Sequence, residues 1–409
     1  MKEYRTYTVR LFPTRKQEQE LKRLSLIRNT LYNKLIGIEQ RTYEKEDRIK
    51  SEYDLDKFIT RMRRDDENLA RLNAKACQRV AKEIFGAYRT FFALVKKDKT
   101  ARPPRQIENV DAFHTIVYSQ SGWKFLNGET VRLNGIELRY KGMPNLDTSS
   151  VNVKEVKLKC RNGKYLLDLG TEEDVPEPET MTSENRVLAI DLGLKNLVNG
   201  VDNKGNVVTL PNKAKRINQY FRKQIAKVQS KLSACKKGSH RDRRLRKVRR
   251  KMYNRKNAQV RQALHAQSKK LAGMNYRTIV VGDLSVKQLM STEKNRKKNV
   301  RRSFDETCVS TFVDFLTYKC RRRQTEVETV SERWTTQTNC LTGKLFKEKV
   351  GLGDRMVRLN GSIAIDRDLN AAVNIMRRYE QNHLALLTAP LDVSDVVRRH
   401  NLLTNTGSR

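Results

Sequence analysis

The chain has 409 residues, and 85 Lys and Arg against 46 Asp and Glu make its formal net charge +39 at pH 7. This surplus exceeds what solubility requires, so it predicts a polyanionic partner that contacts the chain over an extended surface. No apolar run approaches the roughly 20 residues of a membrane span, and no lipidation motif or signal peptide is visible. We therefore expect no membrane contact and no secretion. A chain of this length is expected to form two or three domains.

The six cysteines are scattered, and no two of them are separated by two residues. This spacing argues against a disulfide framework and against a standard zinc ribbon. The simplest interpretation is that most of the thiols serve as small apolar groups.

The first part of the chain changes from helical to β-rich at Pro103-Pro104. A strand over residues 4–11 precedes a capping box at Thr14–Gln17, which starts an amphipathic helix, and a second helical region covers roughly 54–95. Four alternating segments then predict a β-barrel or sandwich that the N-terminal strand completes: 115–119, 130–140, 151–160 and 164–169. The acidic, Pro-containing segment 172–184 is the best candidate for a linker.

A new domain begins with a short β-favouring run that ends in Asp191 and Gly193. Two further runs on either side of the turn at 202–205 extend this strand into a three-strand meander. A carboxylate at the end of a buried strand is costly unless it is paired or holds a cation. Two interpretations stay open at this point: an ordinary turn aspartate, or a metal ligand on a nuclease-type sheet.

Residues 212–274 are predicted to be helical and are extremely basic, with a turn at 238–240. The run 241–251 has almost no compensating acid, so a polyanion beside it explains the sequence better than a solvated face does.

The remaining elements complete the order of an RNase H-like sheet. The run 278–284 predicts a buried strand that lies parallel to and beside the first one. A basic loop at 294–302, a helix, a strand at 326–330 and a final helix follow. Magnesium-dependent phosphodiester hydrolysis needs several converging carboxylates. Five acids end or begin these elements: Asp191, Asp283, Glu332, Asp366 and Asp368.

Four segments, IDLGLKN, VVGDLSVK, RWTTQTNC and DRDLNAAVNI, resemble in this order the split RuvC motifs of TnpB, the RNA-guided nuclease encoded by insertion sequences. The N-terminal YTVRLFPTRKQ and LIRNTLYNKL are similar to the start of TnpB proteins. Fanzor proteins and compact type V CRISPR effectors are close relatives of that family. The resemblance covers roughly residues 3–378, and its motifs are specific as an ordered set.

The resemblance implies a metal-binding triad of Asp191, Glu332 and Asp368, which would hold two Mg²⁺ ions. Asp191 and Asp368 match the first and third acids, whereas Asp366 is the poorer match. The second motif of the family carries a glutamate where this chain has Gly282. Some relatives carry the glutamate instead in a pattern that resembles Val-x-Glu-x-aromatic-Thr, which residues 330–335 fit. Asp283 would project to the opposite face of the strand.

Many relatives also carry two CxxC pairs where this chain has only Cys340. A structural zinc needs four ligands, so we expect none. The insert is then expected to be held by packing alone. Arg367 and Asn370 are implied as supporting groups.

The resemblance implies an α/β multidomain protein that uses a guide RNA (omega RNA) to bind and cleave double-stranded target DNA beside a short duplex motif. The implied parts are a wedge-like β-barrel (1–13 and 100–176), a helical recognition lobe (14–99), a split RuvC-like domain (177–333 and 363–380), a degenerate zinc-ribbon-position insert (334–362) and a tail (381–409). The residues expected to bind nucleic acid are Lys195, Arg243, Arg244, Arg246, Arg249, Arg250, Arg301 and Arg302.

Two alternatives stay open. The first is a protein that a guide RNA directs to DNA but that does not cleave it, because Gly282 removes one expected ligand. The second is a basic nucleic-acid-binding protein that uses no guide. The expected location is the cytoplasm or nucleoid in a prokaryote and the nucleus in a eukaryote.

Overall fold

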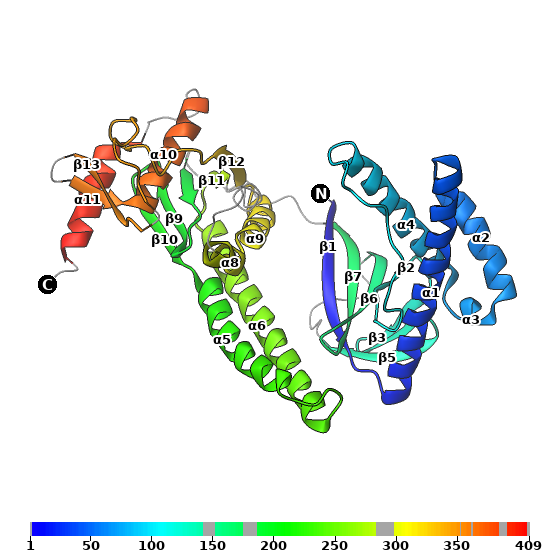
Figure 1. Ribbon diagram of the computed structural model, residues 1–409. Coiled ribbons are helices and arrows are strands. Elements are labelled where there is room, and N and C mark those ends of the chain that lie inside the picture. The colour runs from blue at the N-terminus through cyan, green and yellow to red at the C-terminus, as the bar shows by residue number, and fades with distance from the viewer. Residues whose placement is uncertain are drawn as a thin grey trace. The chain divides into compact units, whose positions relative to one another are not determined.

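The computed structural model describes residues 2–141, 152–174, 186–283, 298–351, 353–360, 363–383 and 391–406, with the backbone alone at residue 3 and in 298–301 and 401–406. The chain is a mixed α/β protein of two compact units, Met1–Glu177 and Pro178–Arg409 (Figure 1). The boundary falls within the predicted linker, whose residues beyond Asp174 lie outside the described part.

The N-terminal unit contains a seven-stranded half-barrel sheet with the strand order β2-β6-β7-β1-β5-β4-β3. Its strands are β1 (Lys2–Leu11), β2 (Ile116–Ser119), β3 (Trp123–Asn127), β4 (Thr130–Leu133), β5 (Ile136–Lys141), β6 (Asn152–Arg161) and β7 (Lys164–Asp174). The N-terminal strand pairs with β7 and β5, both antiparallel, so the first residues complete the later sheet as predicted.

The single strand predicted across 130–140 is wrong, because Asn134 and Gly135 turn the chain back between β4 and β5. Both residues have positive φ, 48° and 83°, which an Asn-Gly pair accepts at low cost in a two-residue hairpin. The strand β3 was also absent from the sequence prediction.

The described part of this unit also contains the helices α1 (Arg15–Glu46), α2 (Glu52–Asp65), α3 (Glu67–Ala70) and α4 (Ala74–Val95). Of these, α4 contacts β2, and α2 packs on α4. The predicted capping box is confirmed, since Gln17 N–H donates to Thr14 Oγ1 and Thr14 N–H donates to Gln17 Oε1. The second helical region is broken into three helices because Asp66 and Asn73 cap new ones.

The C-terminal unit contains a five-stranded sheet with the order β10-β9-β8-β11-β12. Its strands are β8 (Val187–Asp191), β9 (Asn196–Asp202), β10 (Val207–Pro211), β11 (Thr278–Asp283) and β12 (Glu326–Ser331). The first three form the predicted meander, and β11 pairs parallel with β8 on one side and β12 on the other. The prediction that the later strand lies parallel to and beside the first is therefore confirmed.

Alternating side chains send the two faces of this sheet into separate hydrophobic clusters. Ala189 and Val280 pack with α10 (Arg367–Asn382) and α11 (Val393–Thr406) on one face. Ile190 and Val281 pack on the other face with α6 (His240–Ala272) and α9 (Val309–Arg321). Successive residues along a strand thus point alternately toward α10 and toward α6, and this alternation decides which helix the last side chain of a strand faces.

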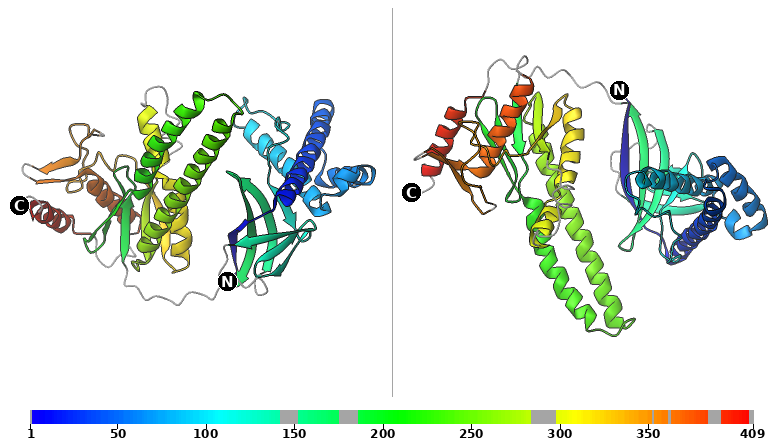
Figure 2. Two further views of the ribbon diagram at one scale, coloured as in Figure 1. Left: turned by 90° about the horizontal axis from the view of Figure 1, so that it is seen from below. Right: turned by 45° about the horizontal axis from the view of Figure 1, so that its top comes forward.

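The basic segment forms a long helical hairpin of α5 (Lys213–Ser233) and α6, which extends away from the sheet (Figures 1 and 2). The two helices lie side by side, with the apolar stripe of Phe221, Ile225 and Val228 buried. The predicted turn is confirmed, and Ser239 caps α6 by accepting from Asp242 N–H.

Three short elements complete the unit: α8 (Lys298–Thr307), β13 (Met356–Asn360) and β14 (Ile363–Asp366). The basic loop predicted at 294–302 is wrong from Lys298 onward, because that part is helical, and its earlier residues lie outside the described part. The described part of the tail includes the helix α11, whose Val396 and Val397 are buried against the α10 face. No helix in the described ranges is long and apolar enough to cross a membrane.

Candidate active site

Asp191 ends β8 and is buried there, with 8% of its surface exposed. It shares the face of Val187 and Ala189, which α10 covers, because side chains alternate along a strand. Burial raises the pKa of the Asp191 carboxyl well above its usual range, and the negative charges of Glu332 and Asp368 raise it further. Asp191 is therefore within electrostatic reach of the two other acids of the predicted triad.

Gly282 lies level with Asp191 on the neighbouring strand. The parallel pairing matches Val281 with Ile190, so the next residue of each strand comes to the same level. A side chain at position 282 would project to the same face as Asp191, whereas Asp283 projects to the other face and is exposed. Asp283 is therefore badly placed to replace a strand glutamate.

The Glu332 side chain occupies the space that a side chain at Gly282 would need. A Cβ atom built on Gly282 would lie 2.1 Å from Glu332 Oε1 and 2.4 Å from Glu332 Cγ. Glu332 comes directly after Ser331, the last residue of β12, and its carboxylate folds back over β11. A carboxylate thus lies above Gly282 although β11 itself supplies none on that face.

The Glu332 carboxylate is in an unfavourable environment for a negative charge. Its Oε1 atom is buried without a hydrogen-bond partner. Burial, followed by the negative charge of Asp283, raises the pKa of Glu332 from 4.5 to about 7. A cation beside Oε1 would relieve both effects.

Asp368 lies in the first turn of α10, where cationic side chains hold it. Its carboxylate forms ion pairs with Arg367 at 3.0 Å and with Arg355 at 3.4 Å, and Asn199 Nδ2 lies 3.5 Å from its Oδ2. Asp366 caps the same helix, because its side chain accepts a hydrogen bond from Asp368 N–H. Asp366 is thus committed to the helix terminus.

The donor set fits a divalent cation. Within the described ranges, no three His, Cys, Asp or Glu side chains already converge as a metal cluster. The charges of Glu332 and Asp368 nevertheless act on Asp191, and Glu332 Oε1 has no hydrogen-bond partner. Carboxylate oxygens are the ligands that Mg²⁺ prefers. Asp368 would complete the set by exchanging its arginine partners for the ion.

Asn212 and Lys215, which the sequence analysis missed, hold the loop that follows Asp191. Asn212 Nδ2 donates to the carbonyl oxygens of Gly193 and Leu194 at 3.4 and 3.3 Å, and Lys215 Nζ donates to Leu194 O at 3.1 Å. The only signal in the sequence was an Asn immediately before a helix, which is typical of an N-cap.

The arginines predicted to bind nucleic acid on α6 lie along the helical hairpin. Four of them are exposed and Arg249 is half-buried: the exposed ones are Arg243, Arg244, Arg246 and Arg250. Arg246 also forms an ion pair with Asp242 at 2.9 Å. The other exposed arginines form a positive strip on the hairpin, away from Asp191, Glu332 and Asp368.

The remaining predicted contacts lie on two other elements. Lys195 is exposed in the loop after Asp191, and Arg302 is half-buried on α8. The side chain of Arg301 lies outside the described residues. Of the described cations, only Lys195 therefore follows a strand of the sheet directly, whereas Arg302 lies on a helix that packs on α5.

The insert is fastened by hydrogen bonds as well as by packing, so the expectation of packing alone is wrong. Asn339 Nδ2 donates to Leu359 O at 2.7 Å, and Gln337 and Val350 exchange two hydrogen bonds of 2.9 Å. Cys340 is fully buried, and burial raises the pKa of its thiol to about 11.

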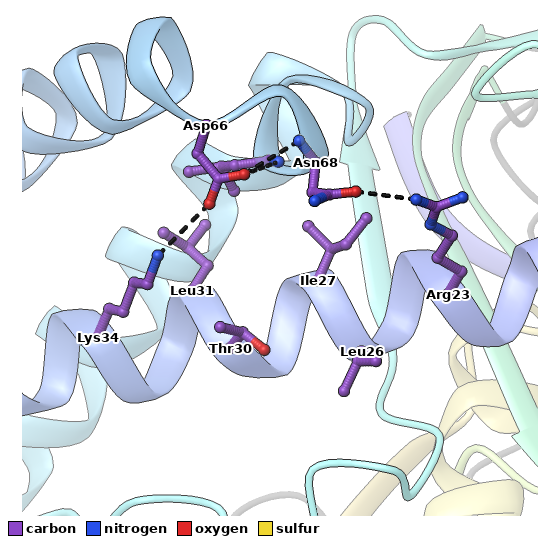
Figure 3. A pocket seen from close by; sticks show the side chains of 9 residues that line it. Arg23, Leu26, Ile27, Thr30, Leu31, Lys34, Asp66 and Asn68 are labelled. Atoms are coloured by element: carbon purple, nitrogen blue, oxygen red, sulfur yellow. Dashed lines mark hydrogen bonds and ion pairs between the residues drawn. The ribbon is translucent and has the colours of Figure 1, made fainter.

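A cavity of about 330 Å³ lies beside α1 in the N-terminal unit (Figure 3). Arg23 donates to Asn68 at 2.9 Å and Lys34 pairs with Asp66 at 3.5 Å across an apolar wall that includes Ile27. Asp66 is the only acid in its lining, so this cavity offers no carboxylate cluster for catalysis.

Three family models match the chain in order along its length. They are described as a helix-turn-helix domain (residues 1–48), a probable transposase (171–293) and a Cas12f1-like TNB domain (310–375). A Streptomyces pristinaespiralis protein, named as a candidate RNA-guided DNA endonuclease, is 24% identical over 380 residues, which are 91% of this chain and 88% of that protein. The matched models and this relative together make the chain similar to TnpB-like, RNA-guided endonucleases along most of its length.

Further relatives and solved structures show a similar likeness. A TnpB-like protein of Methanocaldococcus jannaschii is 26% identical over 215 residues, covering 50% of this chain and 73% of that protein. A Cas12f1–sgRNA–target DNA complex superposes with a TM-score of 0.54 at 12% identity, covering 88% of this chain and 83% of its counterpart. The mini RNA-guided endonuclease CRISPR-Cas phi-3 gives 0.51 at 11% identity, covering 95% and 93%. At such identities the structural likeness shows the fold alone.

We predict that Gly282→Ala prevents this TnpB-like protein from binding a divalent ion without unfolding it. The three atoms nearest to the added methyl group all belong to the flexible Glu332 side chain, which must leave the strand. The melting temperature in EDTA should change by no more than about 2 °C, while the rise on adding Mg²⁺ or Mn²⁺ disappears. Gly86→Ala is the control, since nothing lies within 4 Å of the added atom. An undiminished metal-induced rise in Gly282→Ala contradicts the prediction.

We predict that Glu332→Gln stabilises the metal-free protein, and more so at higher pH. A carboxyl group whose pKa is higher in the folded than in the unfolded state contributes stability below its unfolded pKa. This contribution is lost as the pH rises through the folded pKa. For Glu332 the unfolded pKa is 4.5 and the folded pKa is about 7. The difference in unfolding free energy between the variant and the wild type should grow by on the order of 3 kcal/mol between about pH 4 and about pH 8. Urea denaturation in EDTA measures it, and a pH-independent difference contradicts it.

Proposed function

We propose that this chain is an RNA-guided DNA endonuclease that cleaves DNA with a divalent ion held by Asp191, Glu332 and Asp368. The observation that carries the proposal is the Glu332 carboxylate above Gly282, level with Asp191. It supplies the acid whose absence from β11 was the strongest argument for an inactive protein. The names of two relatives, one called a candidate RNA-guided DNA endonuclease and one the CRISPR-Cas phi-3 endonuclease, support the same class of activity.

The finer fold assignment is part of this proposal. A three-strand antiparallel meander followed by two parallel strands, with helices on both faces, agrees with an RNase H-like, RuvC-type domain. We assign the half-barrel to the wedge role and the helices α1–α4 to the recognition role. The Cas12f1 structure is a complex with sgRNA and target DNA, which supports a guide RNA and target DNA as partners of this chain.

The chain's own residues have separate tasks in the proposed reaction. Asp191, Glu332 and Asp368 would hold Mg²⁺, which when bound activates a water molecule and stabilises the charge on the phosphate. Arg355, 44% exposed, would leave Asp368 and bind a phosphate oxygen of the substrate strand. Asn212 would keep the loop after Asp191 in place while the strand enters.

The helical hairpin is proposed to bind the phosphates of the RNA or of its duplex with DNA. Its exposed arginines have few acidic neighbours, and a long positive strip follows a sugar-phosphate backbone without reading bases. Base pairing with the guide would then supply the sequence specificity, while the protein would read a short duplex motif next to the target.

We predict that Glu332→Ala abolishes cleavage but leaves RNA and DNA binding within about twofold, because only the buried acid is lost. The test is cleavage of a DNA library by the purified complex with Mg²⁺, together with sequencing of the RNA that copurifies. Asp191→Ala should have the same effect, because Asp191 is also a buried acid.

Each alternative has its own outcome in this experiment. A discrete copurifying RNA without wild-type cleavage identifies a guided binding protein. The absence of a discrete RNA identifies an unguided nucleic-acid-binding protein. Cleavage that survives Glu332→Ala removes Glu332 from the site.

We predict that replacing Arg243, Arg244 and Arg250 by Gln weakens RNA binding and lowers its dependence on salt. Loss of three phosphate contacts should reduce the slope of log K against log salt by about 2 to 3. Filter binding over a salt series measures the slope. The control replaces Lys344, Lys347 and Lys349, which are also exposed but lie in the insert. Equal changes in the two triple variants contradict a role for the hairpin.

A further inference from the structure

We propose that Arg378 is a positioning residue that holds Glu332 over Gly282. Its guanidinium group donates from Nη1 to Ser331 O and from Nη2 to Arg333 O, the two carbonyl oxygens on either side of Glu332. The inference rests on the proposed function and deepens it, because it says how a glutamate outside the sheet can replace one on a strand.

The need for such a device follows from where Glu332 lies. A glutamate at position 282 would be fixed by the hydrogen bonds of β11 to both of its neighbouring strands. Glu332 lies one residue beyond the end of β12, in a turn. Outside the ladder, the backbone needs other partners if the carboxylate is to stay within the narrow tolerance of a metal site.

The backbone of this turn adopts a conformation that local preference does not favour. Trp334 has a φ of 68°, in the left-handed region that an aromatic residue rarely enters, and more than half of its surface is exposed. Burial of its ring therefore does not explain the conformation. Thr338 Oγ1 donates to Trp334 O at 2.9 Å, and Thr335 donates to Glu332 O from its N–H and its hydroxyl group. Hydrogen bonds to the carbonyl oxygens therefore keep the turn in place.

One helix supplies the further partners. On α10, Asn374 Nδ2 donates to the carbonyl oxygens of Thr335 and Thr338 at 2.9 and 2.7 Å, and Asn370 Nδ2 donates to Thr338 O at 2.8 Å. Arg378 continues this series one turn further and reaches the carbonyls that flank Glu332. Because Asp368 lies in the first turn of the same helix, α10 relates the position of Glu332 to that of Asp368.

The fork of the guanidinium group suits this task. Two parallel N–H groups in one plane can bind two separate carbonyl oxygens at once and so fix the peptide units between them. A lysine at position 378 keeps the charge but has a single nitrogen atom, so it cannot present two parallel N–H groups in one plane. Arg378→Lys therefore separates the clamp from the charge. Arg377, the adjacent residue, donates to Leu341 O at 3.3 Å, away from Glu332, and provides a matched control.

The experiment compares Arg378→Lys with Arg377→Lys in the full-length protein with its copurified guide RNA. We expect Arg378→Lys to lower kcat for DNA cleavage by about 10- to 100-fold and to raise the Mg²⁺ concentration needed for half-maximal rate. The melting temperature should stay within about 2 °C of that of Arg377→Lys, and the affinities for RNA and for DNA within about twofold. A general structural defect would instead lower the melting temperature and the affinities together with kcat.

A second measurement moves the acid to the strand. In the double variant Gly282→Glu/Glu332→Ala, the carboxylate no longer depends on the turn, so adding Arg378→Lys should not lower its cleavage rate further. If the double variant does not cleave, the rise in melting temperature on adding Mn²⁺ replaces the rate: Arg378→Lys must lose this rise while Arg377→Lys keeps it.

The outcomes separate the inference from the function on which it rests. Equal kcat values for Arg378→Lys and Arg377→Lys overturn the clamp, as does a loss of RNA binding in parallel with kcat. An undiminished metal-induced rise in Arg378→Lys also overturns it. Wild-type protein that does not cleave, or Glu332→Ala that does, instead overturns the proposed function.

Discussion

The buried carboxylates at one end of the five-stranded sheet impose the constraint on which the site depends. Asp191 and Glu332 lose hydration there, so the pKa values of both rise, and the charge of Glu332 contributes to the shift at Asp191. Arg367 and Arg355 already compensate Asp368. Without a cation, the negative charge of these two carboxylates is therefore disfavoured, and the divalent ion that we propose would relieve this cost.

The helix α10 brings together most of what the site requires. Its first turn carries Asp368, its apolar residues cover the sheet face of Asp191, and its polar residues hold the turn of Glu332. In the described part of the chain, the insert is fastened to this unit by hydrogen bonds and packing, with Asn370 Oδ1 accepting from the N–H of the buried Cys340. One helix thus sets the relative positions of three acids that are distant in the sequence.

The positive charge of the chain is divided between two kinds of place. The hairpin of α5 and α6 exposes arginines far along its length from the sheet, whereas Arg355 and Lys215 lie near the acids. Lys215 and Asn212 belong to the first turn of the hairpin and also bind the loop after Asp191. The surface proposed for RNA and the proposed site are therefore parts of one continuous structure.

Local sequence patterns determined the strand that ends at Asp191, the parallel strand after the long helical hairpin, the capping box of α1 and the five candidate acids, because each depends on residues that are close in the chain. The resemblance to the TnpB motifs implied that a ligand is missing at Gly282, and the alternation of side chains along a strand predicted the wrong parity for Asp283. The hairpin at Asn134-Gly135, the helical α8 and the packed tail escaped prediction. Only the tertiary structure decided that Glu332 fills the space above Gly282 and that Arg378 holds it there, since both depend on contacts between distant segments.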